Sequence, residues 1–278
     1  MVGIDTDLRP STAPPSNTDA TSLEVSIETA PADRAPAGSL RRTLALRDFR
    51  LLLGGTATSL LGDQFALIAT PWLVLELTGD PMALGLVLAL GGIPRAAFML
   101  VGGAVADRFA PRNVMLVADV VRGALVAVMA AVVLADAAQL WMLYLFALGF
   151  GVVAGLAVPA ENSIVPTLLG RNDLQTGNAV MMGLAQIAGF VGPTLAGAAI
   201  AIHASEIDGV GVAYAIDAAT FAVSATAFAL MRTTRTAGRT PENTVVASIR
   251  VGLRSIWDDA AMRFVVCVLA AVNLFVVG

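Results

Sequence analysis

The sequence predicts an all-α integral membrane protein with six complete transmembrane helices and the beginning of a seventh. Three observations lead to this prediction: the composition, the length of the apolar runs, and the one-sided distribution of the basic residues. Of the 278 residues, 57% are hydrophobic and 14% are charged, and the mean hydropathy is +0.79. Soluble domains are about 45–50% apolar and about 25% charged, so the composition favours a lipid bilayer over a soluble core.

The chain divides into a polar tail and a series of apolar runs. Residues 1–40 are rich in Pro, Ser, Thr and Ala and have no sustained apolar period, which is typical of a disordered tail. The segment 41–231 then contains six apolar runs, each reaching the ~20 residues needed to cross a ~30 Å hydrocarbon core. We expect spanning helices at 50–77, 83–105, 113–135, 140–168, 175–202 and 210–231.

A polar segment and a last apolar run follow the sixth helix. Residues 232–263 predict a cytoplasmic central loop whose second half forms an amphipathic helix on the membrane surface. The apolar run at 264–278 is too short to span and predicts the start of a truncated seventh helix. We therefore expect the chain to need a missing C-terminal half as its partner.

The arginines predict the orientation of the helices. All 17 basic residues are Arg, and only Arg95 and Arg122 lie inside helices. The others precede the first helix, follow the sixth, or lie in the joints between helices two and three and between four and five, whereas the remaining joints carry none. The positive-inside rule then places the N-terminus, these joints and the central loop in the cytoplasm. We expect a multi-pass protein of the inner (cytoplasmic) membrane.

The joint between helices two and three carries more than topogenic arginines. Its sequence "GGAVADRFAPR" contains an acid and glycines, and neither is needed for orientation. The spacing Gly103-x-x-x-Asp107-Arg108-x-x-x-Arg112 resembles the signature joint of the major facilitator superfamily. The run "AGFVGPTLAG" at 188–197 is similar to the Gly-Pro signature of drug and proton antiporters in that superfamily, with these positions: Gly189, Gly192, Pro193 and Gly197.

Three further sequence runs narrow the resemblance to one branch of the superfamily. The runs "FRLLLGGTATSLLGDQ", "PWLVLELTGDP" and "ADVVRGALVA" resemble the branch that exports siderophores and macrolides, and the likeness covers about residues 45–278. It implies the N-terminal half of the major facilitator fold, a three-plus-three inverted repeat. It also implies a cytoplasmic latch, with Asp107 as the acid, Arg108 and Arg112 as its basic partners, and Gly103 allowing close helix approach. The chain departs from the family in having no Arg in 140–168, where many proton-coupled members carry one.

Six ionisable residues lie at bilayer depth, where each is a functional candidate by default. They are Asp63, Arg95, Asp119, Arg122, Glu161 and Asp217. Asp63 and Arg95 lie near the middle of adjacent helices, so they could neutralise one another. Asp119 and Arg122 are three residues apart on one helical face. The alternative is that such charges form buried ion pairs that only hold the bundle together.

Two local patterns bear on the fourth helix. Glu161 lies between Pro159 and Pro166, and a helix broken by proline at a polar residue is typical of a transport path. The small-residue run "LGFGVVAGLA" at 148–157 favours close helix packing.

Together these features predict a secondary active transporter. We expect proton-coupled export, by alternating access, of a hydrophobic or amphiphilic small molecule of the drug, macrolide or siderophore type. An importer, an uncoupled facilitator or a non-transporting fragment remain alternatives. A single His, no acidic metal cluster, no "GxSxG" and no phosphate-binding glycine loop argue against an enzyme, a cofactor or a metal. The expected partners are the substrate, protons and the lipid bilayer, with no nucleic acid.

Overall fold

The described part of the chain is a bundle of helices. The computed structural model describes residues 40–203 and 205–232, and all of its helices belong to one compact unit. Within these residues every regular element is helical, and six helices are long and apolar enough to cross a membrane. The expected tail before residue 40, the central loop after residue 232 and the expected seventh helix at 264–278 lie outside the described residues.

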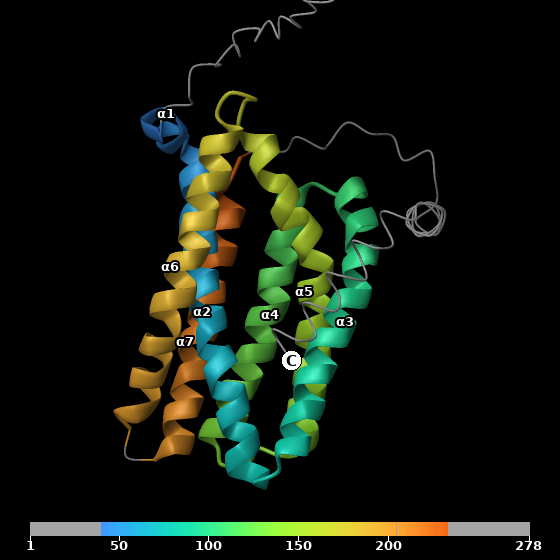
Figure 1. Cartoon of the computed structure of the whole chain (residues 1–278), viewed down its shortest axis with the longest axis vertical. Helices are drawn as coiled ribbons and strands as arrows, with labels where there is room; N and C mark the ends of the chain where they lie inside the picture. The colour runs from blue at the N-terminus through green and yellow to red at the C-terminus, as the bar shows by residue number, and fades with distance from the viewer. Residues whose placement is uncertain (1–39, 204, 233–278) are drawn as a thin grey trace, which may run out of the picture. The chain divides into compact units, whose positions relative to one another are not determined.

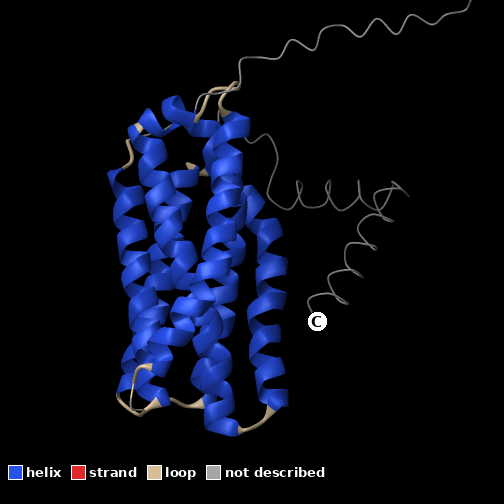
Figure 2. Cartoon of the chain, turned by 60° about the vertical axis from the view of Figure 1, so that its left-hand side comes forward, coloured by secondary structure: helices blue, strands red, loops and turns tan. Residues whose placement is uncertain are grey.

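The six expected spans are all confirmed. The helices are α1 Leu40–Ala45, α2 Arg47–Thr78, α3 Pro81–Arg108, α4 Pro111–Leu134, α5 Leu140–Leu168, α6 Leu174–Ala201 and α7 Glu206–Leu230, joined by short loops at the two ends of the bundle (Figure 2). Hydrophobic runs located α2 to α7 to within a few residues. The short helix α1 was not expected, because six residues are too few to show a helical period.

Local chemistry explains how consecutive spans are separated. Gly79 ends α2 in the left-handed region at φ 60°, where glycine has no steric penalty. Asp80 then caps α3 by accepting a 2.8 Å hydrogen bond from the Met82 amide, and Pro81 occupies the first helical position. Three successive residues therefore stop one span and start the next.

The packing pairs show the expected inverted repeat. The main partners are α3 with α5, α4 with α7, α2 with α7, α2 with α6, and α4 with α5. Exchanging the first three spans with the last three converts the α2–α6 pair into α5–α3 and the α2–α7 pair into α5–α4. In Figure 1, α2, α6 and α7 lie on one side, α3 and α5 lie on the other, and α4 lies between them. The packing partners of the α2–α4 triplet thus correspond to those of the α5–α7 triplet.

We call the end where α2 begins and α7 ends the basic end. The segments there carry Arg47, Arg108, Arg112 and Arg171, whereas the segments at the opposite end carry no Arg within the described residues. The short α1 also lies at the basic end, where Arg42 is 3.8 Å from Asp173. The asymmetry that predicted the orientation is therefore a property of the folded bundle.

Glycines set the close crossing of α3 and α5. A Cβ atom built on Gly151 would collide with the carbonyl oxygen of Gly91, and one built on Gly155 with that of Arg95. The backbones of the two helices therefore touch over a full turn, as small residues at four-residue spacing permit in membranes. The packing role expected for residues 148–157 is confirmed.

The expected break in α5 is absent. Pro159 and Pro166 both lie inside one continuous helix. Each proline removes one helical donor, but membrane helices tolerate this when neighbouring groups cover the freed carbonyls. The carbonyl freed by Pro159 is that of Gly155, and it lies against the backbone of Gly102 in α3. α5 is thus continuous at Pro159, where it packs tightly against α3.

Candidate functional site

A cavity of about 390 Å³ lies in the half of the bundle nearer the basic end. All six spans contribute to its wall, and its lining is both apolar and charged. Five of the six intramembrane charges singled out above line it: Asp63, Arg95, Asp119, Arg122 and Glu161. The structure therefore gathers residues from four helices, separated by up to a hundred positions in sequence, around one volume.

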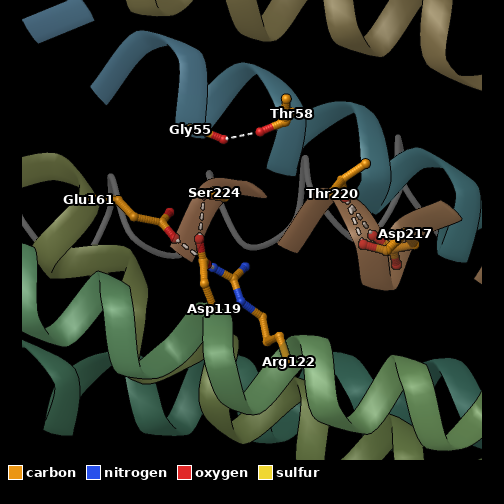
Figure 3. Close-up of polar contacts among 8 residues, drawn as sticks. All are labelled: Gly55, Thr58, Asp119, Arg122, Glu161, Asp217, Thr220 and Ser224. Atoms are coloured by element: carbon orange, nitrogen blue, oxygen red, sulfur yellow. Dashed lines mark hydrogen bonds and ion pairs between the residues drawn. The ribbon is translucent and has the colours of Figure 1, made fainter. Parts of the chain in front are cut away.

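The innermost charges form a fixed pair. Arg122 donates a 2.6 Å hydrogen bond to Asp119 Oδ1 one turn earlier on α4, and the hydroxyl of Ser224 on α7 donates a 2.5 Å bond to Asp119 Oδ2 (Figure 3). Both charged side chains are buried, with 1% and 8% of the Asp119 and Arg122 side chains exposed. The guanidinium also lies 5.0 Å from the centre of the Phe221 ring, a cation–π distance. This pair joins α4 to α7.

Glu161 is a second and looser partner of the same arginine. Its Oε1 lies 3.4 Å from Arg122 Nη2, and 40% of its side chain is exposed. Figure 3 shows Glu161 reaching from α5 toward the arginine that Asp119 already holds. Arg122 is therefore paired with Asp119 whether or not the Glu161 contact is made.

Asp63 and Arg95 do not form the expected pair. Both line the cavity, yet no ion pair joins them in the described part of the chain, and the buried Oδ1 of Asp63 has no hydrogen-bond partner. The physical reason is the helix pairing. The expectation assumed that helices consecutive in sequence are neighbours, whereas α3 packs mainly on α5 and touches α2 only slightly.

Asp217 lies apart from the cavity. Its residue is completely buried on α7, and a Cβ atom built on Gly62 of α2 would lie 2.5 Å from its Oδ1. The hydroxyl of Thr220 lies 3.4 Å from Oδ1 but donates a shorter 2.7 Å bond to the Asp217 backbone carbonyl. The carboxyl oxygen Oδ2 has no partner among the described residues.

The joint between α3 and α4 differs from expectation in two ways. Gly102, and not Gly103, makes the close approach: a Cβ on Gly102 would lie 2.7 Å from the Leu156 carbonyl oxygen, whereas one on Gly103 would meet nothing within 4 Å. One residue along a helix turns the side-chain direction by about 100°, so the two glycines face different surroundings.

Arg112 does not pair with Asp107. Its Nε and Nη2 each donate a 2.6 Å hydrogen bond, to the carbonyl oxygens of Phe228 and Ala229 at the end of α7. Asp107 and Arg108 are exposed, and neither has a hydrogen bond or ion pair within the described residues. The first arginine of α2, Arg47, donates a 3.0 Å bond to the next carbonyl, that of Leu230.

The glycines of the α6 motif lie on different faces of the helix, and only one of them contacts α2. A Cβ on Gly192 would collide with Gln64 of α2, and the buried Ala188 and Ala196 lie one turn on either side of it. Gly189 and Gly197 would meet nothing within 4 Å. The contact stripe is therefore 188, 192 and 196, with Pro193 beside it inside the helix.

Sequence reasoning missed several uncharged polar residues of the cavity wall. They are Thr56, Ser59, Asn162 and Asn178. Their only signal is that each interrupts an apolar run at the depth of the charged residues, and many such hydroxyls and amides bond to their own helix instead.

The bundle and its charged cavity define the class of protein: a six-helix membrane transporter domain built as an inverted repeat. Residues 52–278 match the Major Facilitator Superfamily, and the chain belongs to this family. The fold and the resemblance expected from the joint and the α6 motif are thereby confirmed.

Three relatives have names that describe export. The chain is 29% identical over 223 residues to the multidrug efflux pump Tap of Mycobacterium tuberculosis, covering 77% of this chain and 52% of the relative. It is 28% identical over 134 residues to the enterobactin exporter EntS of Citrobacter koseri, covering 48% and 32%. It is 26% identical over 148 residues to the macrolide efflux protein A of Streptococcus pyogenes, covering 53% and 36%. The chain spans about half the length of the Tap proteins that it matches. The family and these names indicate a transporter and not an enzyme.

Proposed function

We propose that the protein exports a hydrophobic or amphiphilic small molecule of the drug, macrolide or siderophore type in exchange for protons. The observation that carries this proposal is the position of Glu161. Its carboxylate faces the cavity and makes a 3.4 Å contact with an arginine that Asp119 already holds. A proton or a cationic part of a substrate can therefore take the place of Arg122 at Glu161 without leaving the arginine unpaired.

The cavity wall fits a ligand of mixed character. Apolar side chains such as Leu60, Met115 and Met181 line it together with the charged groups. Small-molecule sites are mostly apolar with a few placed polar groups that fix orientation. Export as the direction of transport is supported by the printed names of the three relatives.

Alternating access supplies the transport cycle. In this proposal the described six-helix half lies in the inner membrane with its basic end in the cytoplasm and rocks against a C-terminal half. The one-sided arginines of the bundle support this orientation. The cavity then lies in the cytoplasmic half of the membrane, where an exporter collects its substrate.

The joint between α3 and α4 supplies a latch in this cycle. Asp107 is exposed at the basic end, and no described residue pairs with it, so its carboxylate is available to groups of the opposite half. Arg112 acts differently from the proposed basic partner, because it is bound to the end of α7. We assign the latch to Asp107 and Arg108, and a holding role to Arg112.

The full-length protein reconstituted in proteoliposomes tests the proton coupling. A pH gradient alone should drive substrate accumulation, and a proton uncoupler should abolish it. Glu161→Gln should lose gradient-driven accumulation, while Glu206→Gln, an exposed acid at the first residue of α7, should keep it. Accumulation that survives the uncoupler would indicate a facilitator, and accumulation in the opposite direction an importer.

A further inference from the structure

Asp217 is a buried acid that the proposed exchange at Glu161 does not use. It lies in the middle of α7, is completely buried, and does not line the cavity. Of its two carboxyl oxygens, Oδ2 has no partner among the described residues, and Oδ1 has only the 3.4 Å contact with Thr220. The Thr220 hydroxyl has a single proton, and its shorter bond goes to the backbone.

An ionised carboxylate in these surroundings is costly. Burial of a charge away from water requires an opposite charge or several hydrogen-bond donors, and the described residues give Asp217 neither. A protonated carboxyl group carries no charge and has much weaker requirements. The arrangement in this structure therefore suits the acid form of Asp217.

The groups that face Asp217 do not remove this cost. Asp63 on α2 and Arg122 on α4 are the charged groups that act on it, and Tyr214 is the titratable neighbour on α7 itself. The sequence of α6, the third helix against α7, contains no titratable residue. Arg122 is bound to Asp119, and the Tyr214 hydroxyl is 2.8 Å from that of Thr70.

Asp217 lies against α2 next to a residue that lines the cavity. Gly62 covers the carboxyl so closely that a Cβ atom there would lie 2.5 Å from Oδ1. The next residue, Asp63, faces the cavity with its own Oδ1 unpartnered. One turn of α2 therefore carries Asp63, which lines the cavity, and covers Asp217 of α7, which does not. Both carboxyl groups have incomplete hydrogen bonding among the described residues.

Small residues line part of the interface between α2 and α7. The side of α2 that is buried carries small residues at helical spacing, including Gly55, Ser59, Gly62, Ala66 and Ala69. Small residues let the two helices approach closely, and the side chains of Phe228 and Thr220 on α7 lie against Gly55 and Gly62 of α2. Because Gly62 is the residue that covers Asp217, a displacement of α2 along α7 would uncover the carboxyl group.

We propose that Asp217 is an occluded proton-binding site that exchanges its proton with Asp63 when α2 moves relative to α7. The proton leaves the carboxylic acid of Asp217 and binds the carboxylate of Asp63, so that the negative charge moves from α2 to α7 and the total charge is unchanged. The reverse transfer resets the site. This inference rests on the proton coupling proposed above and adds a second proton carrier to it.

Infrared difference spectroscopy of the full-length protein in lipid tests the proton directly. At neutral pH we expect a carbonyl band of a protonated carboxylic acid that disappears in Asp217→Asn. It should persist in Asp208→Asn, an exposed acid on the same helix. Thr220→Val, which removes the one weak donor to Oδ1, should shift the band without removing it. A spectrum in which Asp217→Asn keeps the band, or in which Thr220→Val leaves it unmoved, would overturn the assignment.

Transport measurements test the exchange. With Asp217→Asn in proteoliposomes, we expect substrate counterflow to continue while the number of protons moved per substrate falls by one. An unchanged proton ratio would overturn the inference and leave the coupling at Glu161 intact. Wild-type transport without any proton movement would instead contradict the proposed function, although the infrared band would still report the proton on Asp217. Loss of the band on adding Na⁺ at constant pH would show a metal-cation site and overturn the proton assignment.

Discussion

The carboxylate of Asp119 lies 2.6 Å from the guanidinium of Arg122, one turn along α4, and its other oxygen accepts a 2.5 Å hydrogen bond from Ser224 on α7. This contact divides the cavity charges into two kinds. Asp119 is buried and accepts two hydrogen bonds, from Arg122 and Ser224. Glu161 is partly exposed and makes one longer contact with the same arginine. The two acids should therefore respond differently to neutralisation.

Asp119→Asn should destabilise the bundle, and Glu161→Gln should not. Removing one member of a buried ion pair leaves an uncompensated charge and costs about 3–5 kcal/mol. Glu161 is too exposed for such a loss. Thermal unfolding in detergent, followed by tryptophan fluorescence, measures the difference. Equal shifts of the unfolding temperature for the two variants would show that Glu161 is also a structural partner.

Asp63→Asn and Arg95→Gln should have additive effects on stability. The two side chains share a cavity wall, but no ion pair joins them among the described residues. Removing one charge therefore does not deprive the other of an ion-pair partner. A double-mutant cycle should give a coupling energy within about 0.5 kcal/mol of zero. A double variant markedly more stable than the sum of the single changes would indicate direct pairing.

Gly102→Ala and Gly103→Ala form a matched pair that tests the α3–α5 crossing. The added methyl group at Gly102 would lie 2.7 Å from a backbone oxygen, whereas that at Gly103 meets nothing within 4 Å. Overpacking of this kind costs about 1–3 kcal/mol, so only Gly102→Ala should lower the unfolding temperature. The opposite ranking would contradict the helix rotation described above.

Arg112→Met should loosen the end of α7, with Arg108→Met as its control. Arg112 donates two 2.6 Å hydrogen bonds to carbonyl groups near the end of α7. Its positive charge there also interacts favourably with the negative end of the helix dipole. Hydrogen bonds from charged groups contribute about 1.5–3 kcal/mol each. Hydrogen exchange of the residues before Leu230 should accelerate in Arg112→Met and remain unchanged in Arg108→Met. Equal protection in both variants would remove the holding role.

Asp107→Asn should impair transport and leave membrane insertion and unfolding temperature unchanged. The carboxylate is exposed and no described residue bonds to it, so we expect its loss to leave this half of the protein stable, but the proposed latch needs its charge. Asp136→Asn, an exposed acid at the opposite end, is the control and should transport normally. Full transport activity of Asp107→Asn would contradict the proposed latch role of this residue.

The spans were predictable because membrane insertion is a local property. Each run has to satisfy its backbone within one helix and match the thickness of the bilayer, so length and hydropathy locate it without knowledge of its neighbours. The Gly79–Asp80–Pro81 joint is equally local. The short α1 was missed because it has too few residues for either criterion.

The candidate charges were predictable as a set but not in their contacts. Depth in a span identified all six, and five of them line the cavity. The expected pairing of Asp63 with Arg95, the close approach at Gly103 and the break in α5 all failed, because each depends on which helix lies opposite. Helix pairing places α3 against α5 and α2 against α7, and consecutive order in the chain does not reveal it.

The sequence by itself therefore determined the membrane class, the six spans, the asymmetry of arginine and the family, since these follow from composition, periodicity and motif. Only the tertiary structure decided that Asp119 is enclosed while Glu161 is open, that Gly102 is the contact glycine, and that Asp217 is sealed beneath Gly62. The physical reason is that a side chain's surroundings depend on helix rotation and pairing. Neighbouring residues of a helix point about 100° apart, so one can line a cavity while the next packs in a helix interface.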